Sequence, residues 1–470
     1  MIEKKEIFVD GEWIPSLGNG VIEVENPFTE EIFATIPRGH IDDVDRAAKA
    51  AARAFDEWSQ TPVQVRADYL RAIADVIERR AEEFSLAITA EIGSPLVVTT
   101  PVQTMLAVTH LRDTAESMKD VVWDEHVGHT LVHRAAAGVV GAITPWNVPL
   151  LMIAMKVGAA LAAGCTVVLK GTEIAPMSSF LFAEATAEAG LPKGVFNLVS
   201  GTGPEIGEAI VTHPLVDMVS VTGSVRAGRR IMELASASVK RVSLELGGKS
   251  ANIILEGADI ERAVTVGMED AFRNSGQVCG GLSRVLVPRA RLAEVEQIAA
   301  AKAGSYVLGD PSSTTTTLGP VATRAQRDRV RQLIESGIED QAKLIAGGPE
   351  HPAELDKGYF VKPTVFTGDP SIRIAREEIF GPVITIIPFD TVEEAIAIAN
   401  DSDYGLAGAV WAGSDEQARA VALKLRTGRI RINGSPQNGR APHGGFKLSG
   451  MGRENGRYGI EEFLEYQSIG

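Results

Sequence analysis

The sequence predicts an α/β protein built from two doubly wound parallel sheets and a small β element. From residue 138 onward, short β-branched runs alternate with helical stretches and glycine turns, and a second such series runs from about residue 250 to 433. This alternation is typical of parallel sheets covered on both faces. The 470 residues also exceed what one hydrophobic core usually organises, so we expect at least two domains.

The segments before the first sheet predict helices and then a hairpin. Residues 41–93 place apolar side chains three and four positions apart, with charged side chains between them. The strand-like arms around Gly128 predict a protruding hairpin. Its histidines, His126, His129 and His133, do not share one face of a strand, and no cysteine or carboxylate cluster completes a ligand set. We therefore predict no metal site.

The composition excludes several classes of protein. The 61 acidic residues outnumber the 46 Lys and Arg residues, which opposes general attraction to nucleic acid or an anionic membrane. Charged side chains and Trp13 stand where a secretory signal would be apolar, and Lys156 interrupts the most apolar stretch. Two distant cysteines do not make a disulfide framework. These features favour a cytoplasmic protein with free thiols.

Cys279 stands in the sequence NSGQVCGG, where neighbouring small residues offer it little packing. Such a loop allows a substrate to approach the thiol closely. A thiol with an ordinary pKa of about 8.5 needs a base to become a good nucleophile at neutral pH. Cys165, within AAGCTVVLK, instead fits a buried core thiol.

Two polar residues at predicted strand ends are candidate partners of this thiol. Glu245 ends the apolar strand KRVSLEL, and the carboxyl ends of parallel strands face the ligand crevice. An apolar setting would raise its pKa toward that of a useful base. Asn147, in AITPWNVP, has an amide that can donate to an oxyanion. Taken singly, each also fits an exposed strand end or an ordinary turn.

Taken together, five motifs resemble the aldehyde dehydrogenase superfamily, in family order and over essentially the whole chain. They are ITPWN, LELGGKS, NSGQVC, EEIFGPV and PHGGFKLSGMGRENG. The resemblance implies that Cys279 is the nucleophile and that Asn147, with the Cys279 backbone N–H, forms the oxyanion hole. It implies that Glu245 activates water and that Lys156 and Glu454 relay protons. The alternative for this last pair is a surface or interdomain ion pair.

The reaction implied by the resemblance is NAD(P)-dependent oxidation of an aldehyde through a thioester that water hydrolyses to the carboxylic acid. Glu245 favours water over coenzyme A, because acylating members of the family typically lack that glutamate. A semialdehyde or coenzyme A-acylating dehydrogenase remains an alternative. A non-catalytic NAD-binding scaffold is another, although such a protein would be expected to have lost one of the three central residues.

The chain has no G-x-G-x-x-G motif, so its dinucleotide site is predicted from the resemblance. The residues assigned to it are Thr144, Pro145, Trp146, Lys170, Glu173, Gly203, Gly207, Gly223, Ser224, Leu246, Glu378 and Phe380. Glu173 favours NAD, because a carboxylate accepts from the ribose hydroxyls and repels a 2′-phosphate. Gly171 replaces the usual proline after the lysine, which we expect to loosen the turn and to leave NADP possible.

The resemblance also assigns a substrate funnel. Its walls are Val148, Leu151, Met152, Met155, Val278, Gly280 and His443. Their mostly apolar character predicts a medium aliphatic or small aromatic aldehyde. His443 replaces an aromatic residue common in the family. Together with Gln437, Asn438 and Arg440 of the neighbouring loop, it could bind a polar or carboxylated aldehyde, or the loop could form only a hydrated rim.

The resemblance divides the chain into three functional parts. Residues 1–116 and 138–247 form the dinucleotide-binding domain, and residues 248–440 form the catalytic domain. Residues 117–137 and 456–470 form an oligomerisation hairpin and tail, and the tail strand is expected to pair across subunits. A homodimer or homotetramer is predicted.

Overall fold

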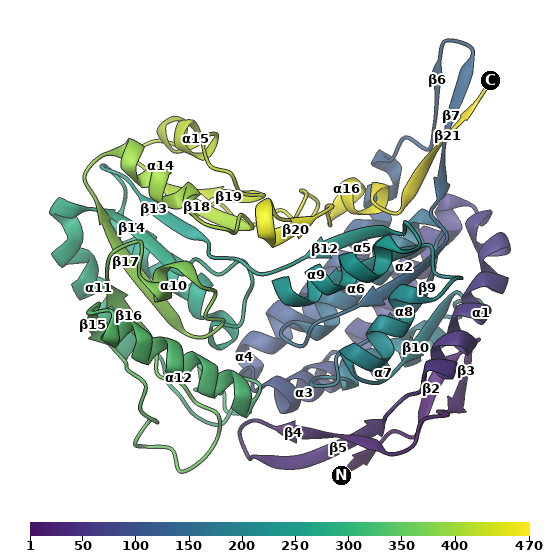
Figure 1. The fold of residues 1–470 in the computed structure, drawn as a ribbon, viewed down its shortest axis with the longest axis horizontal. Helices are drawn as coiled ribbons and strands as arrows, with labels where there is room; N and C mark the ends of the chain where they lie inside the picture. The colour runs from purple at the N-terminus through teal and green to yellow at the C-terminus, as the bar shows by residue number, and fades with distance from the viewer.

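The computed structural model covers residues 1–470 and consists of two α/β lobes and a projecting β-ribbon (Figure 1). One lobe contains an eight-stranded sheet and the other a seven-stranded sheet, while two further sheets have three strands each. The predicted fold class is confirmed. None of the helices combines the length and the apolar character needed to span a bilayer.

The eight-stranded sheet has the order β20-β12-β11-β8-β9-β10-β2-β3. Its strands are β2 (Glu6–Val9), β3 (Glu12–Pro15), β8 (Val139–Ile143), β9 (Thr166–Lys170), β10 (Phe196–Val199), β11 (Met218–Thr222), β12 (Arg241–Glu245) and β20 (Gly450–Met451). The five central strands are parallel. From β8 the chain adds β9 and β10 on one side of that strand, and it then returns to add β11 and β12 on the other side of β8. This reversal creates a switch point between β8 and β11, where open α/β sheets bind ligands.

The seven-stranded sheet has the order β15-β16-β17-β14-β13-β18-β19 and is parallel except at β15. Its strands are β13 (Ala251–Ile254), β14 (Arg284–Pro288), β15 (Lys343–Ala346), β16 (Thr364–Thr367), β17 (Val383–Phe389), β18 (Ala407–Trp411) and β19 (Arg429–Ile432). The edge strand β19 therefore pairs with β18 only.

The helices divide between the two lobes. The first lobe has α1 (Ile41–Ser59), α2 (Val63–Arg79), α3 (Ala81–Ile92), α4 (Leu96–Val98), α5 (Met105–Ser117), α6 (Pro149–Ala163), α7 (Met177–Glu188), α8 (Glu208–Thr212) and α9 (Val225–Ser236). The second has α10 (Ile260–Phe272), α11 (Leu292–Gly304), α12 (Arg324–Glu339), α13 (Arg373–Arg376), α14 (Val392–Asn400) and α15 (Asp415–Ala422), and α16 (Gly456–Glu461) precedes the tail. The helices predicted over residues 41–93 are confirmed as α1, α2 and α3.

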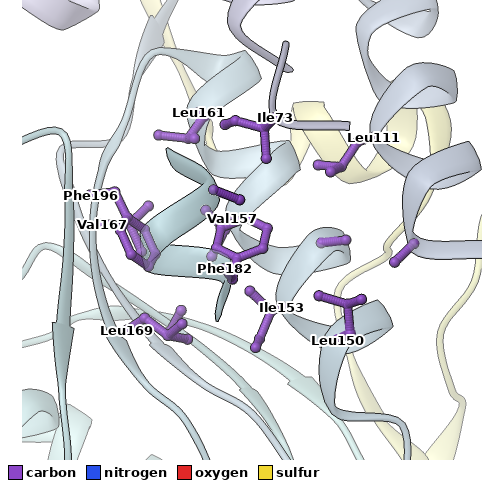
Figure 2. Close-up of a cluster of buried hydrophobic side chains, with 14 of the residues drawn as sticks. Ile73, Leu111, Leu150, Ile153, Val157, Leu161, Val167, Leu169, Phe182 and Phe196 are labelled. Atoms are coloured by element: carbon purple, nitrogen blue, oxygen red, sulfur yellow. The ribbon is translucent and has the colours of Figure 1, made fainter. Parts of the chain in front are cut away.

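Helix α6 is the central buried helix of the first lobe (Figure 2). Its apolar side chains pack between the sheet and the helices α2 and α5. The labelled members of this cluster are Ile73, Leu111, Leu150, Ile153, Val157, Leu161, Val167, Leu169, Phe182 and Phe196. Each fully buried side chain of this size contributes about 1.5–3 kcal/mol. Because Asn147 directly precedes α6 and Lys156 lies within it, this packing positions both residues.

The projecting ribbon consists of β6 (Asp124–Val127), β7 (Thr130–Ala136) and β21 (Leu464–Ile469). The hairpin predicted around Gly128 is present as β6 and β7. The tail strand β21 pairs antiparallel with β7 of the same chain, and its pairing across subunits stays a prediction. The pairing within the chain occupies both edges of β7 and leaves the outer edges of β6 and β21 open. A separate three-stranded sheet contains β1 (Ile2–Glu3), β5 (Glu31–Pro37) and β4 (Val21–Asn26).

Candidate active site

The predicted site residues of the first lobe gather at one edge of its sheet. Strand β8 leads into Thr144 and Asn147, and β9 ends at Lys170. Strand β11 leads into Gly223, and β12 ends at Glu245. Because these strands are parallel neighbours, their carboxyl ends meet at the same edge.

The loop that carries Cys279 has a strained backbone. Asn274, Ser275 and Gly276 have φ values of 51°, 57° and 78°. The left-handed region costs a non-glycine residue on the order of 1–3 kcal/mol. Ser275 Oγ donates to the Gly319 carbonyl at 2.7 Å. A Cβ on Gly276 would lie 2.0 Å from the carbonyl of Gly381, so only glycine fits there. Surrounding contacts thus hold the nucleophile loop in one conformation.

Asn147 both donates a hydrogen bond to this loop and accepts one from it. Its Nδ2 donates to the Gln277 carbonyl at 2.9 Å, and Asn274 Nδ2 donates to the Asn147 carbonyl at 2.8 Å. An amide nitrogen has two N–H groups, so one remains for another acceptor. The structure therefore brings Asn147 to the segment that carries Cys279.

Cys279 is half-buried and lies beside two carboxylates. Burial, followed by the charges of Glu245 and Glu378, raises the pKa of the Cys279 thiol well above its ordinary value, while Arg429 acts in the opposite direction. A Cβ on Gly248 would lie 2.4 Å from the Cys279 carbonyl oxygen. The glycine that follows the Glu245 strand is therefore required for this close approach.

Glu245 is buried, and neither of its oxygens accepts a hydrogen bond from the chain. Its close polar neighbour is His443, whose Nε2 lies 3.2 Å from Glu245 Oε1. His443 and Glu454 are joined by two backbone hydrogen bonds of 2.9 and 2.7 Å. These contacts connect the end of β12 to the C-terminal motif.

Lys156 and Glu454 form a buried ion pair with 2.7 Å between Nζ and Oε1. Their side chains are 1% and 9% exposed, so this is not the surface pair considered from the sequence. Burial alone would raise the pKa of Glu454, but the positive charge of Lys156, with smaller contributions from His443 and His110, gives a net lowering. The fold therefore favours the charged form of the Glu454 carboxyl.

Three of the predicted dinucleotide residues, Thr144, Gly223 and Ser224, follow β8 and β11, the strands that flank the switch point. Ser224 caps α9, because its Oγ accepts from Ala227 N at 3.2 Å. The buried Oγ1 atoms of Thr144 and Thr222 have no partner in the chain. Leu246 is buried, and Gly203 and Gly207 bound a single helical turn after β10.

The segment after β9 differs from the expectation for its glycine. A Cβ on Gly171 would lie 1.9 Å from Ser179 Oγ, so Gly171 is closely packed and does not loosen the turn. Ser179 occupies the space that a proline at position 171 would need. Lys170 Nζ lies 2.5 Å from Glu173 Oε2, and only Glu173 of this pair is appreciably exposed.

The EEIFGPV motif of the second lobe contacts the loops that follow these strands. Glu378 Oε1 accepts from Gly248 N at 3.0 Å. Burial, together with the charge of Glu245, raises the pKa of Glu378 to about 7. Phe380 packs edge-on against Trp146, with 5.4 Å between ring centroids, and Pro145 adjoins Trp146 in the loop after β8.

A cavity of about 200 Å³ leads to Cys279. All seven predicted wall residues line it. Residues that the sequence did not single out also line it, among them Val98, Val102, Gln103, Leu106, Thr109, His110, Asp113, Arg273, Arg429 and Asn455. Arg440 does not, because its guanidinium binds Asp120 at 2.6 Å and Ser117 at 3.2 Å. The missed residues come from segments distant in sequence, and only folding places them at the cavity.

Comparison with known proteins agrees with this geometry. The profile described as "Aldehyde dehydrogenase family" matches residues 13–469. The chain belongs to the aldehyde dehydrogenase family. The predicted family, and with it an oxidoreductase acting on aldehydes, is confirmed.

Individual aldehyde dehydrogenases match the chain over nearly its full length. A 3-succinoylsemialdehyde-pyridine dehydrogenase from a Pseudomonas species is 48% identical, with 100% of this chain and 99% of that protein covered. A variant of aldehyde dehydrogenase C from Pseudomonas syringae, solved with NAD+ and octanal, is 47% identical with a TM-score of 0.98, covering 99% and 96%. The Mycobacterium tuberculosis aldehyde dehydrogenase solved with NAD+ is 39% identical with a TM-score of 0.96, covering 100% and 98%.

Proposed function

We propose that the protein oxidises an aldehyde to the carboxylic acid with NAD as hydride acceptor, through a thioester on Cys279. The observation that carries the proposal is the strained Cys279 loop, hydrogen-bonded to Asn147 and lying within electrostatic range of Glu245. A thiol, an amide donor and a carboxylate at one cavity are the parts that nucleophilic catalysis at a carbonyl requires.

The first step uses Cys279 and Asn147. The Cys279 thiol loses its proton to solvent, and its sulfur attacks the aldehyde carbon. The free N–H of Asn147 and the backbone N–H of Cys279 donate to the developing oxyanion. NAD, when bound, accepts the hydride that leaves this carbon. The carbon is thereby oxidised to a thioester that remains bound to Cys279.

The second step uses Glu245 and the buried pair behind it. Glu245 takes a proton from the water that attacks the thioester. The carbon–sulfur bond breaks, which releases the carboxylic acid and regenerates the Cys279 thiol. We assign proton exit to the path that contains His443, Glu454 and Lys156, because His443 lies beside Glu245 and its backbone is hydrogen-bonded to that of Glu454, which pairs with Lys156. Overall, aldehyde, water and NAD+ yield carboxylate, NADH and two protons.

The residues at the switch point fit a dinucleotide. The start of α9 offers free backbone N–H groups behind Gly223 and Ser224, a suitable place for a pyrophosphate. The unpartnered hydroxyls of Thr144 and Thr222 face the same strand ends. Lys170 and Glu173 would hold the adenosine ribose, and Glu378 the nicotinamide ribose. The NAD complexes of the structural neighbours support this choice.

We also propose that the protein forms a homodimer or homotetramer in the cytoplasm. The open outer edges of β6 and β21 support assembly, because such edges readily pair with another chain. Two free cysteines support a reducing compartment. Light scattering of the intact protein and of a chain ending before β21 tests the assembly. Equal masses for the oligomers of the two chains, apart from the deleted residues, would show that the ribbon takes no part in assembly.

Stopped-flow measurement of NADH tests the reaction. With Glu245→Gln, we expect one burst of NADH per active site followed by a stall, and mass spectrometry should find an acyl group on Cys279. Cys279→Ala should give no burst. Steady turnover by Glu245→Gln would show that Glu245 is not the hydrolytic base. A stall that only coenzyme A relieves would indicate that the acyl group is normally transferred to coenzyme A.

A further inference from the structure

Arg429 occupies a special place in the cavity that leads to Cys279. It is the first residue of the edge strand β19 (Figure 1), and it lines that cavity beside the nucleophile loop. A Cβ on Gly280 would lie 3.2 Å from Arg429 Nη2. The guanidinium thus lies against the residue that directly follows Cys279, and the glycine provides the space.

The charge of this guanidinium is not balanced by the chain. Arg429 forms no side-chain hydrogen bond and no ion pair, and its nearest acidic group is Asp270. Asp270 Oδ1 is already shared by Arg431 at 3.3 Å and Arg273 at 3.6 Å. Two other guanidinium groups therefore already pair with Asp270, and Arg429 has no ion-pair partner at the cavity wall.

Arg429 is half-buried, and a guanidinium that loses part of its hydration without gaining hydrogen bonds is destabilised. A ligand carboxylate would supply those bonds, since the planar fork of arginine matches two carboxylate oxygens. The apolar cavity residues Val102, Leu106 and Met152 can meanwhile contact a methylene chain.

We propose that Arg429 binds a carboxylate carried by the substrate, so that the preferred substrate is an aldehyde with a carboxylate at its other end. This inference rests on the proposed function and assigns its substrate class. It places the carboxylate beside Gly280, whereas the sequence analysis had considered Arg440, which is bound to Asp120 outside the cavity.

Arg429 has a competing role that the test must separate. Its charge also opposes the raised pKa of the Cys279 thiol, so it could activate the nucleophile for every aldehyde. Activation predicts an equal loss for charged and uncharged substrates when Arg429 is replaced. Carboxylate binding predicts a loss confined to charged substrates and expressed mainly in KM.

The experiment compares kcat/KM for matched aldehydes with NAD. The pairs are 4-oxobutanoate with butanal, and 8-oxooctanoate with octanal. We expect the wild type to prefer at least one carboxylated member, and Arg429→Gln to reduce its kcat/KM about 30-fold or more while changing the uncharged partner less than about threefold. Arg429→Lys, which keeps the charge but loses the fork, should retain part of the preference. Arg289→Gln, which removes an exposed guanidinium bound to Asp390, is the matched control.

Several outcomes would overturn the inference. One is a wild type that prefers the uncharged member of both pairs. Another is an equal loss for both members in Arg429→Gln, accompanied by slower alkylation of Cys279. A third is loss of the preference in Arg440→Gln but not in Arg429→Gln. If no aldehyde of either kind yields NADH with the wild type, the proposed function itself fails, which is a distinct result.

Discussion

His443 Nε2 lies 3.2 Å from Glu245 Oε1, and this imidazole is the close polar partner of the proposed hydrolytic base. Both side chains are almost fully buried. The contact joins the carboxyl end of β12 to the C-terminal motif. A residue assigned from the sequence to the substrate wall therefore also positions the base.

Replacing His443 should affect hydrolysis more than acylation. His443→Phe removes the imidazole but keeps a large side chain, so Glu245 loses its partner. We expect the steady-state rate to fall about tenfold with an unchanged NADH burst, because general-base catalysis depends on a positioned base. His443→Gln, whose amide offers Glu245 a polar N–H neighbour, should recover part of the rate. Equal loss of burst and turnover would contradict a role in positioning.

Glu245 should also control the reactivity of the resting thiol. Since its negative charge raises the pKa of Cys279, Glu245→Gln should lower that pKa and increase the thiolate fraction at neutral pH. Iodoacetamide should then alkylate Cys279 several-fold faster at pH 7, and the rise of this rate with pH should shift to lower pH. Cys279→Ala provides the blank. An unchanged pH profile would mean that Glu245 is not charged beside the thiol.

The buried Lys156–Glu454 pair should be important for stability. Lys156→Met leaves a buried carboxylate without its partner, which costs about 3–5 kcal/mol. We expect the urea midpoint to fall, and to fall less in the double variant Lys156→Met/Glu454→Met. A single variant as stable as the wild type would contradict the ion pair.

The same pair should depend on pH in a defined direction. The pKa of Glu454 is lower in the fold than its ordinary value of 4.5, mainly because of Lys156 acting against burial. Its contribution is therefore complete above pH 4.5 and is lost as the pH falls through the lowered pKa. The urea midpoints of the wild type and Lys156→Met should converge over that acidic range. A constant difference would indicate another cause.

Glu173 should determine the choice between NAD and NADP. Its partly exposed carboxylate, held by Lys170 at 2.5 Å, would repel a 2′-phosphate. Glu173→Gln removes that repulsion, and we expect kcat/KM for NADP relative to NAD to rise about tenfold. Glu188→Gln, an exposed change on α7, is the control. An unchanged ratio would assign selectivity to other residues.

Much of the central site was predictable because its residues lie next to local signals. Glu245 ends an apolar strand, Asn147 precedes an apolar helix, and Cys279 stands among glycines. Each signal involves only a few neighbouring residues, and parallel strands bring their ends to one edge. The family motifs then supplied the roles that we propose for them.

The sequence by itself determined the alternation of strands and helices, the family and the candidate nucleophile. Tertiary structure decided that Gly171 packs against Ser179, that β21 pairs with β7 of its own chain, and that Arg429 rather than Arg440 lines the cavity. The physical reason is the distance along the sequence over which each kind of interaction acts. Periodicity and turn chemistry act between near neighbours, whereas the partner of a guanidinium depends on which distant segments pack around it.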